Sequence, residues 1–200
     1  KSAEPWSIDQ YNIIKDLDWR EDYNPRYVEI SFGNTCNLKC AYCSPPYSSK
    51  WVEEIKKFGP YTKNHDFNSL DFVDNRIDTR YKLTDDNPYR DAFWKWWPEL
   101  FKDLHTFRIT GGEPLLHPRF WDLLDMIHEQ QDYRGAFVVN SNLIHEKGQV
   151  QKLIEKTRFL AGDHVFGRVE VHTSCESSMA HSEYTRDGFK ADIWTENVKM

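Results

Sequence analysis

Four short apolar segments recur along the chain, and each is followed by a polar motif and then by a helical pattern. The segments are residues 27–32, 107–110, 136–139 and 168–173. Their alternating or continuous apolar residues are typical of strands. Strands that alternate with helices favour a parallel sheet with right-handed crossovers. The sequence therefore predicts an α/β fold built on parallel strands.

The helical patterns that separate these segments have apolar residues three or four positions apart. They lie at residues 50–58, 93–104, 120–127, 150–154 and 189–198. Pro98 falls inside the second pattern, where proline is expected to kink a helix or to begin its main part. Pro118 is well placed to start the third.

Composition and charge disfavour several classes of protein. The net charge of −6 provides no basic surface for nucleic acid or for an anionic membrane. No apolar stretch approaches the roughly 20 residues of a membrane-spanning helix. Three of the four cysteines are clustered, which is not the pattern of a disulfide framework. We therefore expect a cytoplasmic protein with reduced thiols and with neither a nucleic-acid partner nor a membrane.

The three clustered cysteines are candidate metal ligands. Three residues separate Cys36 from Cys40, and two separate Cys40 from Cys43. Thiolates select iron–sulfur clusters or zinc, but no second cysteine pair or short histidine pair completes a zinc site. Three thiolates suit a [4Fe-4S] cluster in which one iron keeps an open coordination position.

Each predicted strand ends at a polar motif. The motifs are the cysteine cluster, Gly111-Gly112-Glu113-Pro114, Asn140-Ser141-Asn142 and Ser174-Cys175-Glu176. In parallel α/β sheets the chemistry lies at the carboxyl ends of the strands. We therefore expect all four motifs to converge on one edge of the sheet.

Together, the cysteine spacing, Tyr42 before the last cysteine and the Gly-Gly-Glu-Pro motif resemble the radical S-adenosylmethionine (SAM) superfamily. Cys-Asn-Leu-Lys-Cys resembles the branch that modifies peptides and proteins, whose members carry SPASM or shorter twitch domains. Twitch-type members are also resembled by Ser44-Pro45, Ser48-Ser49-Lys50-Trp51 and Glu183-Tyr184-Thr185-Arg186. The resemblance extends from about residue 27 to residue 199.

The resemblance implies a fold, two cofactors and a reaction. The fold is a partial (βα) barrel with about four of six βα units present, so the remaining strands and any auxiliary domain would lie beyond Met200. The cofactors are a [4Fe-4S] cluster and SAM, whose amino and carboxylate groups bind the open iron. One electron cleaves SAM, and the 5′-deoxyadenosyl radical abstracts hydrogen from a substrate, expected to be a peptide or protein. Flavodoxin or ferredoxin would supply the electron.

The resemblance also implies cofactor-binding residues, with Cys36, Cys40 and Cys43 as metal ligands. These residues are Tyr42, Gly111, Gly112, Glu113, Pro114, Asn140, Ser174 and Arg186. Tyr42 is expected against the adenine and Glu113 against the methionine ammonium. Asn140 and Ser174 are expected at the ribose and carboxylate, roles that Ser141, Asn142 or Thr173 can also fill. Arg186 either pairs with the cofactor carboxylate or faces solvent.

Other features leave alternatives open. Residues 1–26 are an irregular or partly helical lead-in to a core at 27–200, and residues 59–91 are either a solvated insertion or a substrate-facing lid. Cys175 either faces the substrate cavity or is an ordinary small residue at a strand end. The residue that guides the substrate radical is not identified. The alternatives to an enzyme are a non-catalytic iron–sulfur electron carrier and a zinc-stabilised binding module.

Overall fold

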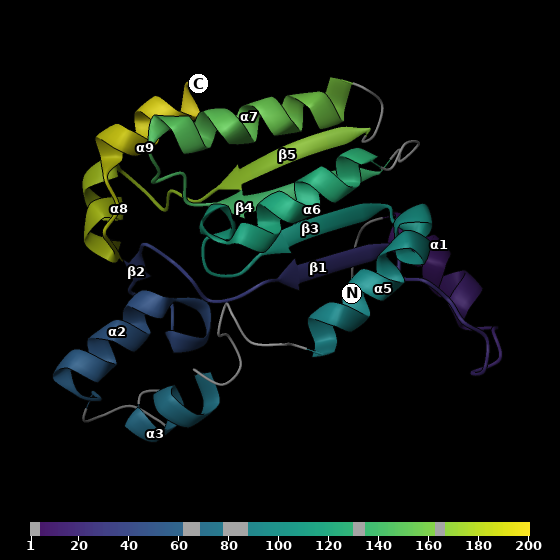
Figure 1. The fold of residues 1–200 in the computed structure, drawn as a ribbon, viewed down its shortest axis with the longest axis horizontal. Coiled ribbons are helices and arrows are strands. Elements are labelled where there is room, and N and C mark those ends of the chain that lie inside the picture. Colours follow the sequence, from purple (N-terminus) through teal and green to yellow (C-terminus); the bar gives the residue numbers. More distant parts are fainter. Residues whose placement is uncertain (1–4, 62–68, 78–87, 130–134, 163–166) are drawn as a thin grey trace.

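The central element is a parallel sheet of four strands. The computed structural model describes residues 5–61, 69–77, 88–129, 135–162 and 167–200 (Figure 1). The strands are β1 (Tyr27–Ser31), β3 (Thr106–Thr110), β4 (Ala136–Ser141) and β5 (Arg168–Thr173), in the order β1-β3-β4-β5. All three pairings are parallel. The predicted α/β fold is confirmed, and the sheet is consistent with a partial βα barrel.

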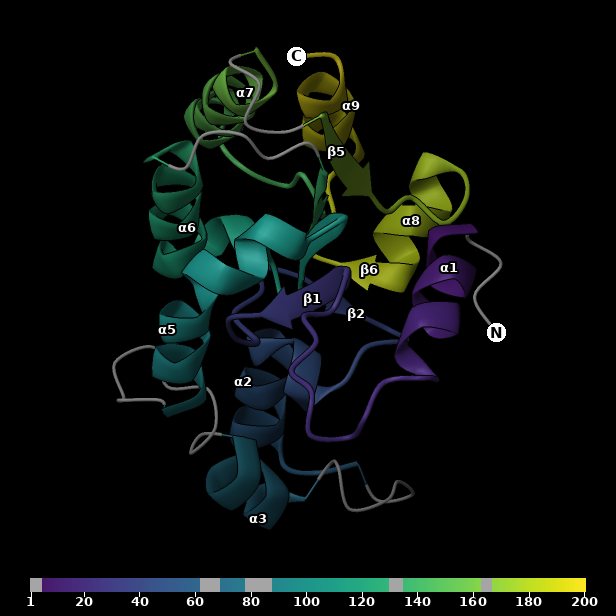
Figure 2. The same ribbon diagram turned by 90° about the vertical axis from the view of Figure 1, so that its right-hand side faces the viewer.

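Three helices cover one face of this sheet. They are α5 (Pro88–Asp103), α6 (Pro118–Glu129) and α7 (Lys147–Gly162). Figure 2 shows them in a row on one side of the strands, with α1 (Pro5–Ile14) and α8 (Met179–Thr185) on the other side. The last helix, α9 (Ala191–Val198), begins two residues after Phe189, where its predicted pattern started.

The hydrophobic core lies between the sheet and these three helices. Phe107 and Ile109 of β3 are fully buried, whereas the residues that alternate with them are only half-buried. Phe120 and Leu123 of α6 belong to the same core cluster. Burying a side chain of this size stabilises the fold by about 1.5–3 kcal/mol. The half-buried residues of β3, which alternate with Phe107 and Ile109, therefore lie on the opposite face of the sheet, away from this core.

Pro98 lies inside α5 without ending it. The helix begins at Pro88, earlier than the apolar pattern from residue 93 indicated, and runs through Pro98 to Asp103. Trp97, directly before the proline, is fully buried, and its ring centroid lies 4.7 Å from that of Phe107. This aromatic packing holds the helix against β3 across the proline.

The segment at 59–91 lies partly outside the described residues, at 62–68 and 78–87. Its described part contains α3 (Leu70–Phe72) and the π-helical turn η3 (Val73–Ile77). Phe72 and Val73 are buried in a small cluster with Val52 and Ile55 of α2 (Ser49–Phe58). The described part therefore packs on α2 as a satellite of the main core.

A two-stranded antiparallel ladder holds the cysteine segment. It joins β2 (Lys39–Cys40) to β6 (Arg186–Asp187), with Cys40 opposite Arg186. A 3₁₀ turn, η1 (Pro45–Tyr47), then leads into α2. Figure 1 shows β2, α2 and α8 beyond the arrowheads of the four parallel strands. Of the helices in the described ranges, none is long and apolar enough to cross a membrane.

Candidate functional site

A cavity of about 480 Å³ lies at the carboxyl ends of the parallel strands. This volume is within the range of small-molecule sites. The predicted site residues that line it are Cys36, Cys40, Tyr42, Cys43, Gly111, Gly112, Glu113, Asn140, Ser174 and Arg186. Pro114 is buried at the start of the 3₁₀ turn η4 (Pro114–Leu116) and is not among the lining residues. The expected convergence of the four motifs on one sheet edge is confirmed.

The cysteine segment is fixed by hydrogen bonds to the start of α2. The Cys36 amide donates to Ser49 Oγ at 3.1 Å. Ser48 Oγ donates to the Leu38 carbonyl at 2.7 Å, and the Trp51 indole donates to the Cys40 carbonyl at 3.0 Å. A segment without long strands or helices of its own is thereby held at the cavity wall.

The thiols of this segment are free and partly desolvated. Burial raises the pKa of Cys36 to about 11 and also raises the pKa of Cys43. Both side chains are therefore protonated thiols at neutral pH while no metal is bound. Because a metal ligand must be a thiolate, metal binding has to release these protons.

The donor set fits a cluster better than a single ion. Among the described residues, no three or more His, Cys, Asp or Glu side chains are placed to hold one metal ion. In a cubane each thiolate binds a different iron, so the three sulfurs need not meet at one point. The described side chains lining the cavity contribute no imidazole and no fourth thiol. Cys36, Cys40 and Cys43 would thus hold three irons and leave the fourth open toward the cavity.

The two glycines after β3 bring the turn against the cysteine segment. Gly111 and Gly112 have φ values of 81° and 52°, which disfavour residues with a Cβ. A Cβ on Gly112 would lie 2.4 Å from the Thr35 carbonyl oxygen, and one on Gly111 would lie 1.7 Å from Ser31 Oγ. The Glu113 amide donates to the same Thr35 carbonyl at 2.7 Å. The glycines are required here by the chain's own packing.

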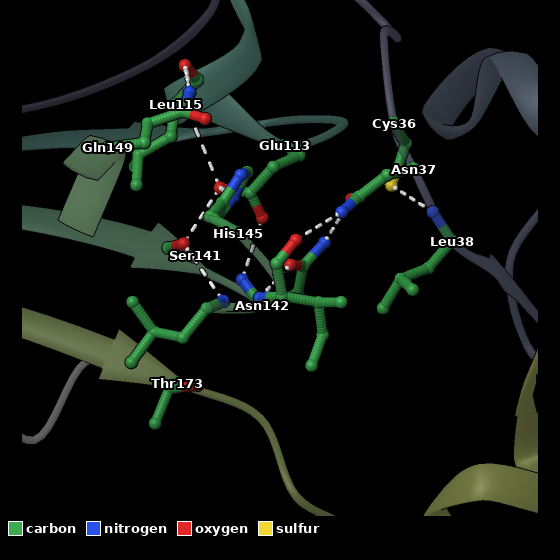
Figure 3. A network of polar contacts seen from close by, with 12 residues as sticks. Cys36, Asn37, Leu38, Glu113, Leu115, Ser141, Asn142, His145, Gln149 and Thr173 are labelled. Atoms are coloured by element: carbon green, nitrogen blue, oxygen red, sulfur yellow. Dashed lines mark hydrogen bonds and ion pairs between the residues drawn. The ribbon is translucent and has the colours of Figure 1, made fainter. Parts of the chain in front are cut away.

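Glu113 is buried and is the centre of the polar network in Figure 3. Its Oε1 accepts from Ser141 Oγ at 2.7 Å and from the Leu115 amide at 3.4 Å. Its Oε2 accepts from the Asn142 amide at 2.7 Å. The carboxylate therefore joins the ends of β3 and β4. It still lines the cavity and, with about four lone-pair sites, keeps capacity for a further donor.

His145 is a buried neighbour that sequence reasoning missed. Its side chain is 2% exposed, and its Nε2 lies 3.1 Å from Glu113 Oε1 without forming a hydrogen bond. The sequence showed eight dispersed histidines and no spacing that marked this one. The fold brings it to Glu113 because the loop after β4 turns back at Leu143, which has a φ of 54°.

Arg186 is buried beside the cysteines, which rules out the solvent-facing alternative. Its Nη1 donates to the Ser174 carbonyl and lies 3.5 Å from Glu176 Oε1. Its Nε is buried and has no hydrogen-bond partner among the described residues. A buried donor without a partner is costly, so it marks the place where an acceptor on a ligand would be stabilised.

Tyr42 is an exposed member of the predicted site residues that line the cavity. Its side chain is 62% exposed, and its hydroxyl donates to the carboxylate of Glu176. Burial and this hydrogen bond raise the pKa of Tyr42. The ring is available to a ligand that enters from the open side of the cavity.

Asn140 is held by a charged pair that the sequence did not single out. Its Oδ1 accepts from Arg108 Nε at 3.2 Å and from Arg108 Nη2 at 3.0 Å. Arg108 Nε lies 3.8 Å from Glu29, whose carboxylate also accepts from Thr110 Oγ1 at 3.0 Å. Glu29, Arg108 and Thr110 line the same cavity. Alternation along β1 and β3 was the signal that could have found them.

Two remaining candidates lie apart from the cavity lining. Thr173 Oγ1 accepts from the Trp194 indole at 3.0 Å, so its hydroxyl packs toward α9. Cys175 Sγ lies 3.4 Å from both the Ser177 carbonyl and Ser182 Oγ. Of the two alternatives for Cys175, the geometry favours an ordinary small residue after a strand.

The pattern of the Radical SAM superfamily matches residues 30–165. The chain belongs to this superfamily. Proteins of the superfamily bind a [4Fe-4S] cluster and SAM, and the three thiols and the cavity beside them fit both cofactors. The match begins in β1 and covers the cysteine segment, the glycine turn and the end of β4.

A distant relative gives a narrower comparison. The GTP 3′,8-cyclase of Sulfurovum sp. (strain NBC37-1) is 25% identical over 127 residues, which are 63% of this chain. The chain spans 30% of the length of that relative. No solved structure gives a significant match.

Proposed function

We propose that this chain is the catalytic core of a radical SAM enzyme. The observation that carries the proposal is the single cavity lined by Cys36, Cys40, Cys43 and Arg186 at the carboxyl ends of the strands. When bound there, the cluster supplies the electron that cleaves SAM to a 5′-deoxyadenosyl radical, which abstracts hydrogen from the substrate.

The chain's own residues bind and orient the cofactors. The buried Nε of Arg186 donates to the carboxylate of SAM, which gives this orphaned donor a partner. The free lone pair of Glu113 accepts from the amino group of SAM. Tyr42 lies along the adenine at the open side, and Asn140 and Ser174 provide the polar contacts to the ribose and carboxylate.

A peptide or protein is the substrate class that we propose first. The Cys-Asn-Leu-Lys-Cys segment supports this class through its resemblance to the peptide-modifying branch. The cavity wall supports it too, because Glu29 and Arg108 lie 3.8 Å apart there. A carboxylate beside a guanidinium suits a ligand that carries both donors and acceptors, and it repels part of a polyphosphate.

A nucleotide such as GTP is the second candidate. It is supported by the GTP 3′,8-cyclase relative and by the two arginines, Arg108 and Arg186, that line the cavity.

Under either candidate substrate, the proposal includes a twitch-type protein of which this chain forms the core at 27–200. It also includes a cytoplasmic location, where thiols stay reduced, and flavodoxin or ferredoxin as the electron donor.

Anaerobic turnover tests the proposal. The reconstituted protein, incubated with dithionite and SAM, is expected to form 5′-deoxyadenosine, and the Cys43→Ala variant is not. A cluster without 5′-deoxyadenosine would indicate the electron carrier, and zinc without sulfide would indicate the binding module. If GTP is consumed in proportion to the 5′-deoxyadenosine formed, GTP rather than a peptide is the substrate.

A further inference from the structure

We propose that Asn37 and Asn142 form a positioning pair that aligns the cysteine segment with the end of β4, and thereby sets the cluster relative to bound SAM. The inference rests on the proposed function. Asn142 Nδ2 donates to Asn37 Oδ1 at 2.7 Å, and 104 residues of sequence lie between the two. Figure 3 shows this contact bridging the cysteine segment and the β4 end.

Three polar groups of Asn142 each make a separate contact. Its amide donates to Glu113 Oε2 at 2.7 Å, and its Oδ1 accepts from the Ile144 amide at 2.8 Å. The second contact closes a local turn of the kind that asparagine favours. The Nδ2 group is the part that reaches Asn37. Asn142 is 6% exposed, so the loss of a partner for Nδ2 is not compensated fully by water.

Asn37 makes the return contact from the cysteine segment. Its Nδ2 donates to the Ile144 carbonyl at 2.6 Å, while its Oδ1 accepts from Asn142. The two asparagines thus form a closed pair of contacts with the turn after β4. Asn37 is the residue after Cys36 and lies three residues before Cys40, so a shift of its backbone moves both ligands.

The pair completes a continuous connection around the cavity. Glu113 joins the ends of β3 and β4 through Ser141 and Asn142. Asn142 then extends this connection through Asn37 to the metal ligands. The groups proposed to bind SAM and those proposed to bind iron are held in one hydrogen-bonded frame, so a small displacement of either one misaligns the two cofactors.

Asn142→Asp tests the hydrogen bond from Asn142 to Asn37 separately from the turn after β4. The aspartate keeps an acceptor for the Ile144 amide but places a carboxylate opposite Asn37 Oδ1, so the donor to Asn37 is lost. Asn142→Ala removes both contacts, and Asn37→Ala removes the bridge from the other side. Asn24→Asp is the matched control, because Asn24 Nδ2 also donates, to Asp103 at 2.8 Å, and its Oδ1 accepts from the Trp96 indole, near the amino end of β1.

Three measurements are made on each variant. The first is the alkylation rate of the buried Cys40 in the metal-free protein, mapped by mass spectrometry. The second is the rate of iron release from the reconstituted protein to a chelator. The third is the KM for SAM and the kcat of reductive SAM cleavage, with unfolding in urea recorded alongside.

The pair predicts a specific pattern. Asn142→Asp should raise Cys40 alkylation and iron release by about tenfold, the size expected from one lost buried hydrogen bond. Asn37→Ala should raise both by at least as much, because it removes the contact with Asn142 and also the donor to the Ile144 carbonyl. The KM for SAM should rise more than kcat falls. The double variant should add less than twofold to Asn37→Ala, because that variant has already lost the contact that Asn142→Asp removes. Asn24→Asp should lower the urea midpoint without changing alkylation or iron release.

Three outcomes would overturn the proposed positioning role of Asn37 and Asn142. One is Cys40 alkylation equal to wild type in both single variants. Another is a fully additive double variant. The last is a KM effect in Asn142→Asp alone, which would make Asn142 a direct SAM contact. Absence of SAM cleavage in the wild type would instead overturn the proposed function, while the metal-free alkylation result would still test the pair.

Discussion

Single residues at this site do more than one thing, and Glu113 is the clearest case. A glutamate after two glycines was expected from the sequence to meet the ammonium of SAM. In the structure Glu113 is 2% exposed, and its carboxylate already accepts hydrogen bonds from Ser141, Asn142 and Leu115. The glutamate of the motif is therefore first a structural acceptor that joins the ends of two strands. Its proposed contact with SAM is a second role.

Glu113→Gln should destabilise the fold. The glutamine turns one acceptor oxygen into a donor, which faces either the Asn142 amide or the Ser141 side of the network. Leaving a buried donor unpaired costs about 1–3 kcal/mol. Urea unfolding of the metal-free protein measures the loss. Glu99→Gln, at an exposed position of α5, is the control and should stay within about 0.5 kcal/mol of wild type. Equal midpoints for the two variants would contradict the assignment.

The buried thiol of Cys36 should make stability fall at high pH. Its pKa in the folded chain is about 11, above the ordinary value of 9.0, because burial disfavours the thiolate. A raised pKa of this kind stabilises the folded state fully below pH 9.0 and loses that contribution as the pH rises toward 11. Urea midpoints of the metal-free protein at about pH 8 and pH 10.5 test this, with Cys36→Ser as the comparison. A wild-type decline no steeper than that of the variant would show that Cys36 is not the cause.

At the scale of elements, the spacing of apolar residues and the polar motifs that follow them were enough to place the strands. All four predicted strand segments overlap observed strands, because alternating residues such as Phe107 and Ile109 face the core and those between them do not. The contacts that close the site could not be predicted in this way. Asn37 with Asn142, and His145 with Glu113, are distant in sequence and meet only because parallel strands end at one edge. Alternation places Arg108 on the face opposite the core, but it does not show that this face, with Glu29, lines a cavity.

The glycine turn between β3 and η4 should not tolerate a side chain. Gly112→Ala would place a Cβ 2.4 Å from the Thr35 carbonyl at a φ of 52°. The turn must then move away from the cysteine segment. We expect a loss of about 1–3 kcal/mol in urea unfolding and a reduced iron content after reconstitution. Gly148→Ala in α7, where a Cβ meets no atom of the described residues within 4 Å, should instead be neutral or stabilising by up to about 1 kcal/mol. The same response from both variants would contradict this account of the turn.

At the scale of the whole molecule, the residues that form the hydrophobic core lie apart from the residues that form the site. The helices α5, α6 and α7 bury the apolar face of the sheet, whereas the other face carries Glu29 and Arg108 toward the cavity. The cysteine segment and Arg186 are held together by the β2–β6 ladder, outside the main sheet. A sheet that is stabilised from one side leaves the carboxyl ends of its strands free to present a site.

The central claim is a cluster held by three thiolates with one iron open to SAM. Electron paramagnetic resonance of the anaerobically reconstituted and reduced protein tests it most directly. The account predicts a reduced [4Fe-4S] signal in wild type whose shape changes when SAM is added, and no such signal in Cys36→Ala, Cys40→Ala or Cys43→Ala. A cluster signal that SAM leaves unchanged, or one that survives the loss of these cysteines, would contradict it.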